Sequence, residues 1–329
     1  MISLAGALQL NVEQETNRIV TAMQRAVREH MHKRGAVVGV SGGVDSATVL
    51  ALCVKAFGPD KVIALILPEI DSDPDSERLG VLAAEACGVS PIVEHLTAAL
   101  EGFGCYRRRD EAIRQVFPEY EAAAGYKAKI MLPQNVLEEG ALNFFSLCIV
   151  TPEGEMKTKR LALAQYLQIV AASNFKQRAR MSMLYYYAEA NNYAVIGTPN
   201  KNEHEQGFFV RHGDSGADFR PIVHLLKTQV YQLANYLKVP REIIDRPPTT
   251  DTYSAHSTQQ EFFFRLPFET MDLLWQAQEM GFSHEQVSSE TGLKTEQVQR
   301  AFDDFDRKRK TTEHLRAPAL SVPDVEAWD

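Results

Sequence analysis

The 329-residue chain has few cysteines, no long apolar run and no excess of positive charge, and each absence excludes a class of protein. Its four cysteines form no CxxC pair and no zinc-ligand spacing, so we expect reduced thiols in a cytoplasmic protein. No apolar run approaches the roughly 18 residues of a membrane span, and no basic segment at the start indicates a secretory signal. The net charge of −8 argues against a protein that coats nucleic acid. What remains is a globular protein with enough apolar residues for a sizeable core.

Buried strands alternate with helices in the first third of the chain. Residues 35–69 indicate a strand, a glycine turn, an apolar helix and a second strand at 62–67, whose almost wholly apolar sequence is typical of a strand covered on both faces. A helix is expected at 75–87, and short strands at 91–94 and 193–197. Joined by right-handed crossovers, these elements predict an α/β fold, a Rossmann-like doubly wound parallel sheet with helices on both faces.

Several other segments complete the predicted organisation. Asn11 is expected to cap an N-terminal helix. Residues 102–154 break the α/β alternation and are interpreted as an insertion, serving as a lid or an interface element. We divide the chain into a main domain, residues 1–275, and a C-terminal helical extension, residues 276–329. The remaining predictions are helical regions at 159–191, 225–237 and 283–310, and a polar loop at 250–260.

The strongest chemical signal is the loop at residues 41–46, Ser-Gly-Gly-Val-Asp-Ser, between a predicted strand and a predicted helix. Its glycines let the backbone approach an anion, and the N–H groups of the loop and of the helix start attract phosphate. Asp45 would repel bare phosphate, so it indicates a magnesium ligand. The simpler alternative is a turn in which Asp45 caps the helix. The loop is neither the GxxxxGK[ST] of kinases and GTPases nor the GxGxxG of dinucleotide redox enzymes.

This loop resembles the pyrophosphate-binding loop of the ATP pyrophosphatases, which attack the α-phosphate of ATP and release pyrophosphate. Within that superfamily, the second half of the chain is similar to the NAD synthetases. The resemblance covers roughly residues 35–250, apart from the insertion, and implies a homodimeric cytoplasmic enzyme that converts deamido-NAD to NAD with ATP, magnesium and ammonia. The matching motifs are FKQRARM at 175–181, GT at 197–198 followed by Glu203, GFF at 207–209, GDSGAD at 213–218, LKTQ at 226–229 and PT at 248–249.

The resemblance also implies the site residues. Asp45 and Glu203 would hold magnesium on the phosphates, and Lys227 would neutralise the departing pyrophosphate, which makes these three the expected catalytic residues. Each of them also permits a purely structural role, as does an ion pair between Arg178 and Asp218. The implied ATP-binding residues are Gly39, Ser41, Gly42, Gly43, Val44, Asp45, Ser46, Thr198, Lys227 and Thr249. The implied deamido-NAD-binding residues are Arg178, Arg211, Asp218 and His314.

The nitrogen source and the exclusion of water follow from the same resemblance. Only 34 residues precede the first predicted strand, so we expect no second catalytic domain there, and free ammonia or a separate glutaminase partner would supply nitrogen. Water would hydrolyse an acyl-adenylate before ammonia arrived. The insertion and the 250–260 loop are therefore expected to order over the site.

Three departures from the family leave a different carboxylate substrate open. The family's C-terminal His-Lys pair is His314-Leu315 here, with Arg316 as a candidate replacement for the missing cation. The family's acidic loop is the aromatic sequence QEFFFR at 260–265. The insertion is also longer than small NAD synthetases have between these elements.

Two other classes of function remain as alternatives. Transfer-RNA thiolation shares the pyrophosphate loop, and Cys105, beside the basic run 106–109, would be its reactive thiol. The missing CxxC pair and the net charge argue against it. Residues 283–302 have the helix–glycine–helix pattern of a DNA-binding helix-turn-helix. Such hairpins are commoner as packing units, so we interpret this one as a cap or a dimer element.

Overall fold

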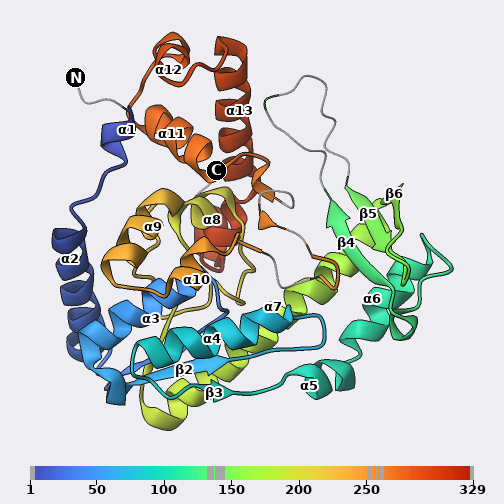
Figure 1. Cartoon of the computed structure of the whole chain (residues 1–329), viewed down its shortest axis with the longest axis horizontal. Coiled ribbons are helices and arrows are strands. Elements are labelled where there is room, and N and C mark those ends of the chain that lie inside the picture. The colour runs from blue at the N-terminus through green and yellow to red at the C-terminus, as the bar shows by residue number, and fades with distance from the viewer. Residues whose placement is uncertain are drawn as a thin grey trace.

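A parallel sheet of four strands forms the centre of the molecule (Figure 1). The computed structural model describes residues 4–131, 137, 145–249, 253–256, 258–259 and 263–326. The strand order is β3-β2-β1-β7, and β1 pairs in parallel with both β2 and β7, so the predicted parallel sheet is confirmed. The strands are β1 (Ala36–Gly39), β2 (Val62–Ile66), β3 (Ile92–Val93) and β7 (Ala194–Ile196).

Helices cover both faces of the sheet because successive side chains of a strand point to opposite sides. In β1, Ala36 and Val38 join one buried apolar cluster and Val37 joins another. The doubly wound architecture is therefore confirmed. The first cluster is completed by α2 (Val12–Gln24), α3 (Val44–Phe57), α4 (Pro74–Ala86), α9 (Lys227–Tyr236) and α10 (Arg241–Asp245), and the second by α5 (Thr97–Gly102) and α7 (Leu163–Asn191).

The N-terminal helix begins where the sequence predicts. Asn11 caps α2, and its Oδ1 accepts a hydrogen bond from the Gln14 N–H at 3.1 Å. Ile19 and Met23 are buried in the first cluster, where α2 packs on α3 and α9. A π-helical turn, Arg25–His30, prolongs α2, and a short 3-10 turn, Pro59–Lys61, connects α3 to β2.

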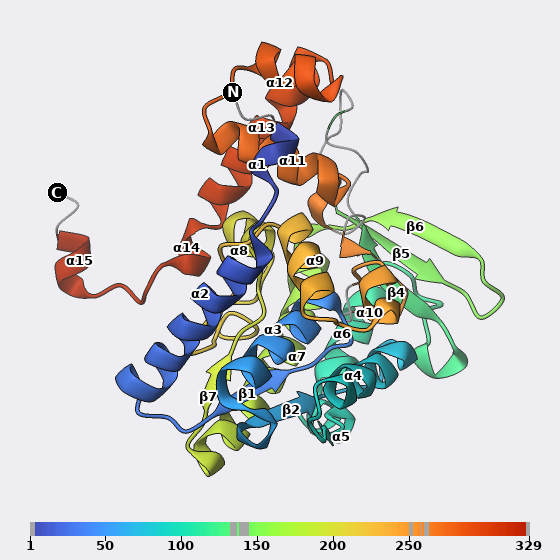
Figure 2. The same cartoon turned by 60° about the vertical axis from the view of Figure 1, so that its left-hand side comes forward.

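The insertion carries an antiparallel sheet of its own, at the right of Figure 2. The strands β4 (Lys127–Met131), β5 (Ser146–Val150) and β6 (Met156–Arg160) pair in chain order. The sheet runs past residue 154, and the helix predicted from residue 159 begins instead at Leu163, because residues 156–160 are hydrogen-bonded to β5. Their polar sequence suits an exposed edge strand as well as a helix. The insertion also holds α6 (Cys105–Arg114), which packs on α7, and a 3-10 turn, Ala122–Ala124.

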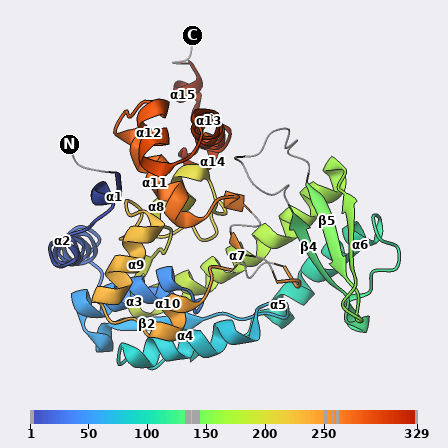
Figure 3. The same cartoon turned by 45° about the horizontal axis from the view of Figure 1, so that its top comes forward.

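The C-terminal helices form a second core, above the sheet in Figures 1 and 3. Trp275 and Phe305 are buried there together with Leu4 of α1 (Leu4–Ala7), so both ends of the described chain contribute. The division at 275/276 stays a prediction and falls within α11. Val287 and Phe302, from the predicted glycine-linked hairpin, pack into this core. The helices are α11 (Phe268–Glu279), α12 (His284–Thr291), α13 (Thr295–Thr311), α14 (Glu313–Arg316) and α15 (Val322–Glu326). Within the described ranges no helix is both long enough and apolar enough to cross a membrane.

Candidate active site

A cavity of about 590 Å³ opens at the carboxyl ends of β1, β2 and β7. Parallel α/β sheets bind their ligands at this edge. Glu203 lines the cavity, whereas Gly42 does not. The implied ATP-binding residues on its wall are Gly39, Ser41, Gly43, Val44, Asp45, Ser46, Thr198, Lys227 and Thr249.

The loop at 41–46 is closed by Ser46. Its hydroxyl donates to the Gly43 carbonyl at 3.0 Å and accepts from the Ser41 N–H at 3.2 Å. Gly43 occupies the N-cap of α3 in an extended conformation, and no side chain of the described residues caps the helix there. The alternative in which Asp45 caps α3 is therefore wrong. The backbone N–H groups of the first turn are thus not taken by a side-chain cap, and their binding of an anion stays a prediction.

Asp45 instead lies between two polar partners. Its carboxylate forms an ion pair with the Lys227 ammonium and accepts from Asn200 Nδ2 at 3.1 Å. Lys227 is the first residue of α9 and is fully buried. Burial by itself would lower the pKa of Lys227, but the Asp45 and Glu203 carboxylates outweigh it and raise that pKa above its ordinary value. A charged lysine thus lies beside the 41–46 loop.

Glu203 is held next to this pair by a capping box. It lies in α8 (Lys201–Gln206), where Asn200 Oδ1 accepts from its N–H and its Oε2 accepts from the Asn200 N–H, both at 3.0 Å. Asn200 therefore fixes Glu203 and Asp45 at once. Removal from bulk water and the nearby Asp45 charge raise the pKa of Glu203 to about 8. Our sequence reasoning missed Asn200, although the N-x-x-E spacing is the signal of such a box.

A second layer of hydrogen bonds positions α9. Asn202 Oδ1 accepts from the Lys227 N–H at 2.9 Å, and its Nδ2 donates to Asp272 at 2.7 Å. The other Asp272 oxygen accepts from the Thr228 N–H at 2.8 Å. Asp272 belongs to α11, so the C-terminal core fixes the start of the helix that carries Lys227. These partners are far apart in the sequence, and no spacing rule links them.

Comparison with known proteins matches this arrangement to one family. The sequence model of NAD synthase fits residues 15–112 and 144–319. The chain belongs to the NAD synthase family. It is 48% identical to an NH3-dependent NAD(+) synthetase of Mesorhizobium japonicum over 96% of this chain and 98% of the relative, and 34% identical to one of Thermotoga maritima over 89% and 95%.

Solved structures agree with the fold. The chain resembles the NH3-dependent NAD synthetase of Campylobacter jejuni with a TM-score of 0.61 at 20% identity, covering 95% of this chain and all of that one. It resembles the NMN synthetase of Francisella tularensis with a TM-score of 0.60 at 23% identity, covering 95% and 99%. The stretch 113–143, which the family model passes over, lies inside the predicted insertion.

The carboxylates of this NAD synthase family member fit a magnesium ion that a nucleotide brings with it. Asp45 and Glu203 both face the cavity and supply the hard oxygen ligands that magnesium prefers. Burial first, and the Asp45 charge second, raise the pKa of Glu203, and a divalent cation would offset both effects. No group of three or more His, Cys, Asp or Glu residues that could hold a metal occurs in the described part of the chain. Phosphate oxygens and water would therefore complete the ligand set.

The implied deamido-NAD residues lie outside this cavity. Arg178 is exposed and donates to the Arg211 carbonyl at 3.1 Å, not to Asp218, so the structural alternative of an Arg178–Asp218 pair is wrong. Arg211 in turn donates to the His314 carbonyl at 3.2 Å. Asp218 accepts from the Val195 N–H at 2.8 Å and from the Tyr185 hydroxyl at 3.0 Å. Three of the four thus form one surface group, and their role in binding stays a prediction.

The structure locates the residues that depart from the family pattern. Leu315 lines the cavity, whereas Arg316 donates to the carbonyls of His204 and Arg309 at 3.1 and 2.6 Å. Arg316 therefore ties the C-terminal segment to the end of α8 and does not supply the missing cation. Residues 260–262 lie outside the described residues, but Phe263 lines the cavity and stacks on Phe208 at 4.8 Å.

The insertion and the 250–260 loop both reach the cavity. Phe145 of the insertion lines it and stacks on Tyr166 of α7 with ring centroids 4.1 Å apart. Tyr253 and Gln259 line it as well, and Gln259 donates to Glu203 at 3.4 Å. Both segments thus place side chains on the cavity wall, as a cover over the site would. That they become ordered when ligand binds stays a prediction.

Cys105 has none of the character of a sulfur carrier. It is buried, and its thiol donates to the Ala172 carbonyl at 3.4 Å. Burial raises the pKa of Cys105 in spite of the nearby Lys176 and Arg109 cations. The thiolate that thiolation chemistry needs is therefore disfavoured.

Gly42→Ala is expected to destabilise the protein by disrupting the turn at residues 41–46. Gly42 has a φ of 75°, and an added Cβ would lie 2.6 Å from the Ser76 carbonyl oxygen and 2.9 Å from the Leu79 Cβ. We expect the free energy of unfolding to fall by about 2–4 kcal/mol, from overpacking and a left-handed φ, with a parallel loss of ATP affinity. Gly58→Ala is the matched control, because Gly58 has a φ of 83° with nothing within 4 Å of its Cβ position. Equal losses in the two variants, measured by urea unfolding, would contradict the packing argument.

The ligand-free protein is expected to lose stability as the pH rises from 6 to 8. Glu203 has a pKa near 8 when folded against 4.5 ordinarily, so between these values only the folded state keeps the proton. The contribution of Glu203 to the free energy of unfolding is therefore fully present below pH 4.5, and it is lost as the pH rises to 8. Burial also raises the pKa values of Asp214 and Asp272, each to about 6, so their contributions end near pH 6. Thermal unfolding of wild type and Glu203→Gln should therefore differ in slope between pH 6 and 8; parallel curves would rule out the shift.

Proposed function

We propose that this protein converts deamido-NAD to NAD with ATP and ammonia, releasing AMP and pyrophosphate. The observation that carries the proposal is the convergence of Lys227, Asp45 and Glu203 beside the 41–46 loop in one cavity. Its relatives at 44–48% identity are named NH3-dependent NAD(+) synthetases, which supports the same reaction here.

The chemistry divides into activation and amide formation. A carboxylate is a poor acyl donor, so its oxygen attacks the α-phosphorus of ATP, the bond to pyrophosphate breaks, and an acyl-adenylate remains. Ammonia then attacks the acyl carbon, AMP leaves, and a proton is released. Magnesium, held by Asp45 and Glu203, would screen the phosphate charge. Lys227 stabilises the charge that develops on pyrophosphate, and the α3 N–H groups orient the phosphates.

Exclusion of water is assigned to the aromatic wall of the cavity. Phe145, Tyr166, Tyr253 and Phe263 line it, and each replaces water with apolar surface around the acyl-adenylate.

A homodimer is part of the same proposal. Leu163 and Leu167 of α7 expose 70% and 54% of their surface, as expected of side chains that another copy covers. Light scattering after gel filtration should give twice the chain mass of 36.9 kDa. A monomer at micromolar concentration would remove this part of the proposal.

The deciding experiment measures AMP and NAD together. Protein, magnesium, ATP and ammonium are incubated with deamido-NAD, and we expect NAD and AMP in equal amounts. Omission of ammonium should abolish NAD. No NAD from a protein that binds Mg-ATP would contradict the proposal.

The second candidate is amidation of a different carboxylate by the same chemistry. It is favoured by Leu315, which lines the cavity where the family places a lysine. The same assay with other acids, beginning with the acid form of nicotinamide mononucleotide, tests it. AMP release with one of them and not with deamido-NAD would select this candidate.

A further inference from the structure

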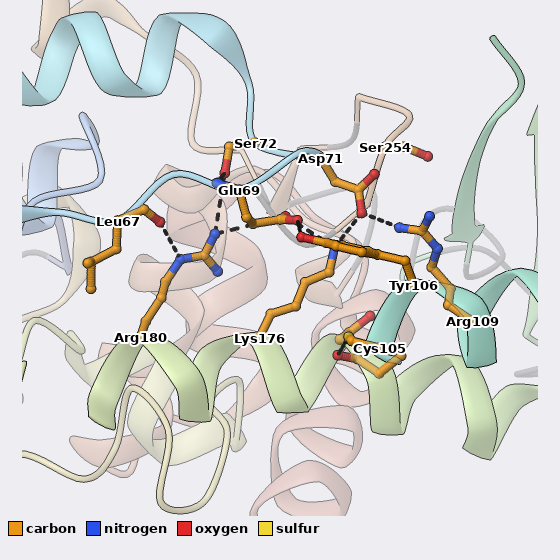
Figure 4. A network of polar contacts seen from close by, with 12 residues as sticks. Leu67, Glu69, Asp71, Ser72, Cys105, Tyr106, Arg109, Lys176, Arg180 and Ser254 are labelled. Atoms are coloured by element: carbon orange, nitrogen blue, oxygen red, sulfur yellow. Dashed lines mark hydrogen bonds and ion pairs between the residues drawn. The ribbon is translucent and has the colours of Figure 1, made fainter. Parts of the chain in front are cut away.

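Arg180 is a cationic residue in the cavity wall to which the proposed reaction assigns no role. It lies on α7, and Figure 4 shows its guanidinium held against the segment after β2. Nε donates to the Leu67 carbonyl at 3.1 Å and Nη2 to the Ser72 hydroxyl at 3.3 Å. Nη1 is buried, and no described residue accepts a hydrogen bond from it. Two of the three nitrogens are therefore fixed, and the third is without an acceptor.

The carboxylates near Arg180 are already occupied. Glu69 is the nearest one recorded, 4.0 Å from Nη2, and it accepts from Lys176 Nζ at 3.1 Å and from the Tyr106 hydroxyl at 2.8 Å. Asp214 also influences Arg180 electrostatically, but its Oδ1 accepts from the Val210 N–H at 2.8 Å. Neither carboxylate satisfies Nη1.

A buried ion network holds the segment to which Arg180 is anchored. Lys176, fully buried one helical turn before Arg180, contacts both Glu69 and Asp71 (Figure 4). Arg109 of α6 pairs with Asp71 from the other side and with Asp110 at 2.8 Å. Residues 67–72 are thus clamped between α7 and the insertion, and the Arg180 guanidinium is pre-positioned on them. A cation fixed in this way loses little conformational entropy when it binds an anion.

We propose that Arg180 binds an anionic oxygen of a nucleotide in the cavity through Nη1. This inference rests on the proposed function and deepens it by adding a binding residue. A buried N–H without an acceptor costs free energy, and a phosphate or carboxylate oxygen is the acceptor that a guanidinium binds most strongly. Of the anionic groups that the two substrates carry, we assign Nη1 to one of two: a phosphate of ATP or the reacting carboxylate of deamido-NAD.

Arg178 cannot take this place. It precedes Arg180 by two helical positions, a rotation of about 200°, and its exposed guanidinium donates to the Arg211 carbonyl outside the cavity. The motif FKQRARM thus carries two arginines with different environments. Our sequence reasoning selected Arg178 as the ligand, and the structure places Arg180 in the cavity.

The test compares ligand affinities of Arg180→Gln and Arg180→Lys with wild type by calorimetry, using Mg-ATP and deamido-NAD separately. One charge-assisted hydrogen bond predicts that the glutamine variant binds one of the two about 10- to 100-fold more weakly. The ligand affinity of Arg180→Lys should lie between those of Arg180→Gln and the wild type. Arg107→Gln is the control, because this exposed arginine pairs with Glu111 at 2.8 Å and lies outside the cavity.

Two probes, each lacking one of the candidate anionic groups, separate direct contact from a structural role. Adenosine lacks the phosphates of ATP, and NAD carries an amide in place of the acid of deamido-NAD. If Arg180 binds a phosphate, only the ATP affinity falls and the adenosine affinity stays; if it binds the carboxylate, only the deamido-NAD affinity falls and the NAD affinity stays. Equal loss for a nucleotide and its probe, or no loss in either arm, overturns the proposal. Should Arg180→Gln fail to fold, the lysine variant is judged by the same comparison.

Failure of the proposed function would be recognised separately. Wild-type protein that makes no NAD contradicts the proposed reaction, but it leaves the comparison of Mg-ATP with adenosine intact. A weakened Mg-ATP arm would then still support the Arg180 contact, and an unchanged one would remove it.

Discussion

Asp45→Asn is expected to lower the rate of NAD formation by about 10²- to 10³-fold, the usual effect of removing one electrostatic group from a transition state. The substitution keeps the shape of the side chain and removes its charge. That charge pairs with Lys227 and would supply one of the two carboxylates proposed to hold magnesium. The loss should therefore be accompanied by a higher magnesium requirement, measured as the rate against magnesium concentration at fixed ATP.

The fold should survive this change because Glu203 can replace the missing charge. The Asp45 carboxylate is one of the causes that hold the pKa of Glu203 near 8. Without it, Glu203 ionises more readily and Lys227 keeps an anionic partner. We expect a melting temperature within a few degrees of wild type. Asp303→Asn, on the exposed side of α13, is the matched control and should leave activity unchanged. A variant at Asp45 with more than a tenth of wild-type activity would remove Asp45 from the catalytic residues.

Lys227→Met is expected to reduce activity by at least about 100-fold, with a loss of stability that depends on pH. The methionine fits a fully buried position without charge. It leaves Asp45 and Glu203 facing each other with no cation between them. The Lys227 charge lowers the pKa of Glu203, so in the variant Glu203 keeps its proton to a higher pH than in wild type, and Asn200 still donates to Asp45. At still higher pH, where Glu203 ionises, the two carboxylates repel each other.

The difference in unfolding free energy from wild type should therefore be smaller at pH 6 than at pH 9, although the Asp45–Lys227 pair is lost at both. It should approach about 3–5 kcal/mol, the cost of breaking a buried pair, at pH 9. Urea unfolding at both pH values measures it. Lys201→Met is the control, because Lys201 pairs with Glu279 at 2.7 Å away from the cavity wall. A pH-independent difference would show that Lys227 stabilises the protein through packing and not through these carboxylates.

Local patterns in the sequence predicted the sheet well. Apolar runs of four to six residues, separated by a glycine turn or a helix, are typical of buried parallel strands, and β1, β2, β3 and β7 lie within the predicted segments. The strand at 156–160 was missed because its polar residues have no periodicity that favours a strand. Pairing with β5, from an earlier part of the chain, decides its conformation.

The residues of the candidate site likewise divide into those that the sequence predicted and one that it did not. The 41–46 loop could be recognised because each of its residues serves a local geometry: a glycine at positive φ, a helix start without a cap, and a serine that closes the turn. Asp45, Glu203 and Lys227 were selected by resemblance, and the structure brings all three to one cavity. Asn200, which joins two of them, was not selected, although its capping box is a local signal.

The sequence by itself determined the fold class, the glycine loop at 41–46 and the family, because these depend on short-range spacing and on motifs in a fixed order. The tertiary structure alone decided which arginine of FKQRARM faces the cavity, which carboxylates surround Lys227, and what Arg316 does. Those answers depend on side chains that approach from distant elements, such as Asp71 and Arg109 around Lys176. Burial and neighbouring charge set the behaviour of these groups, and both arise only when the chain is folded.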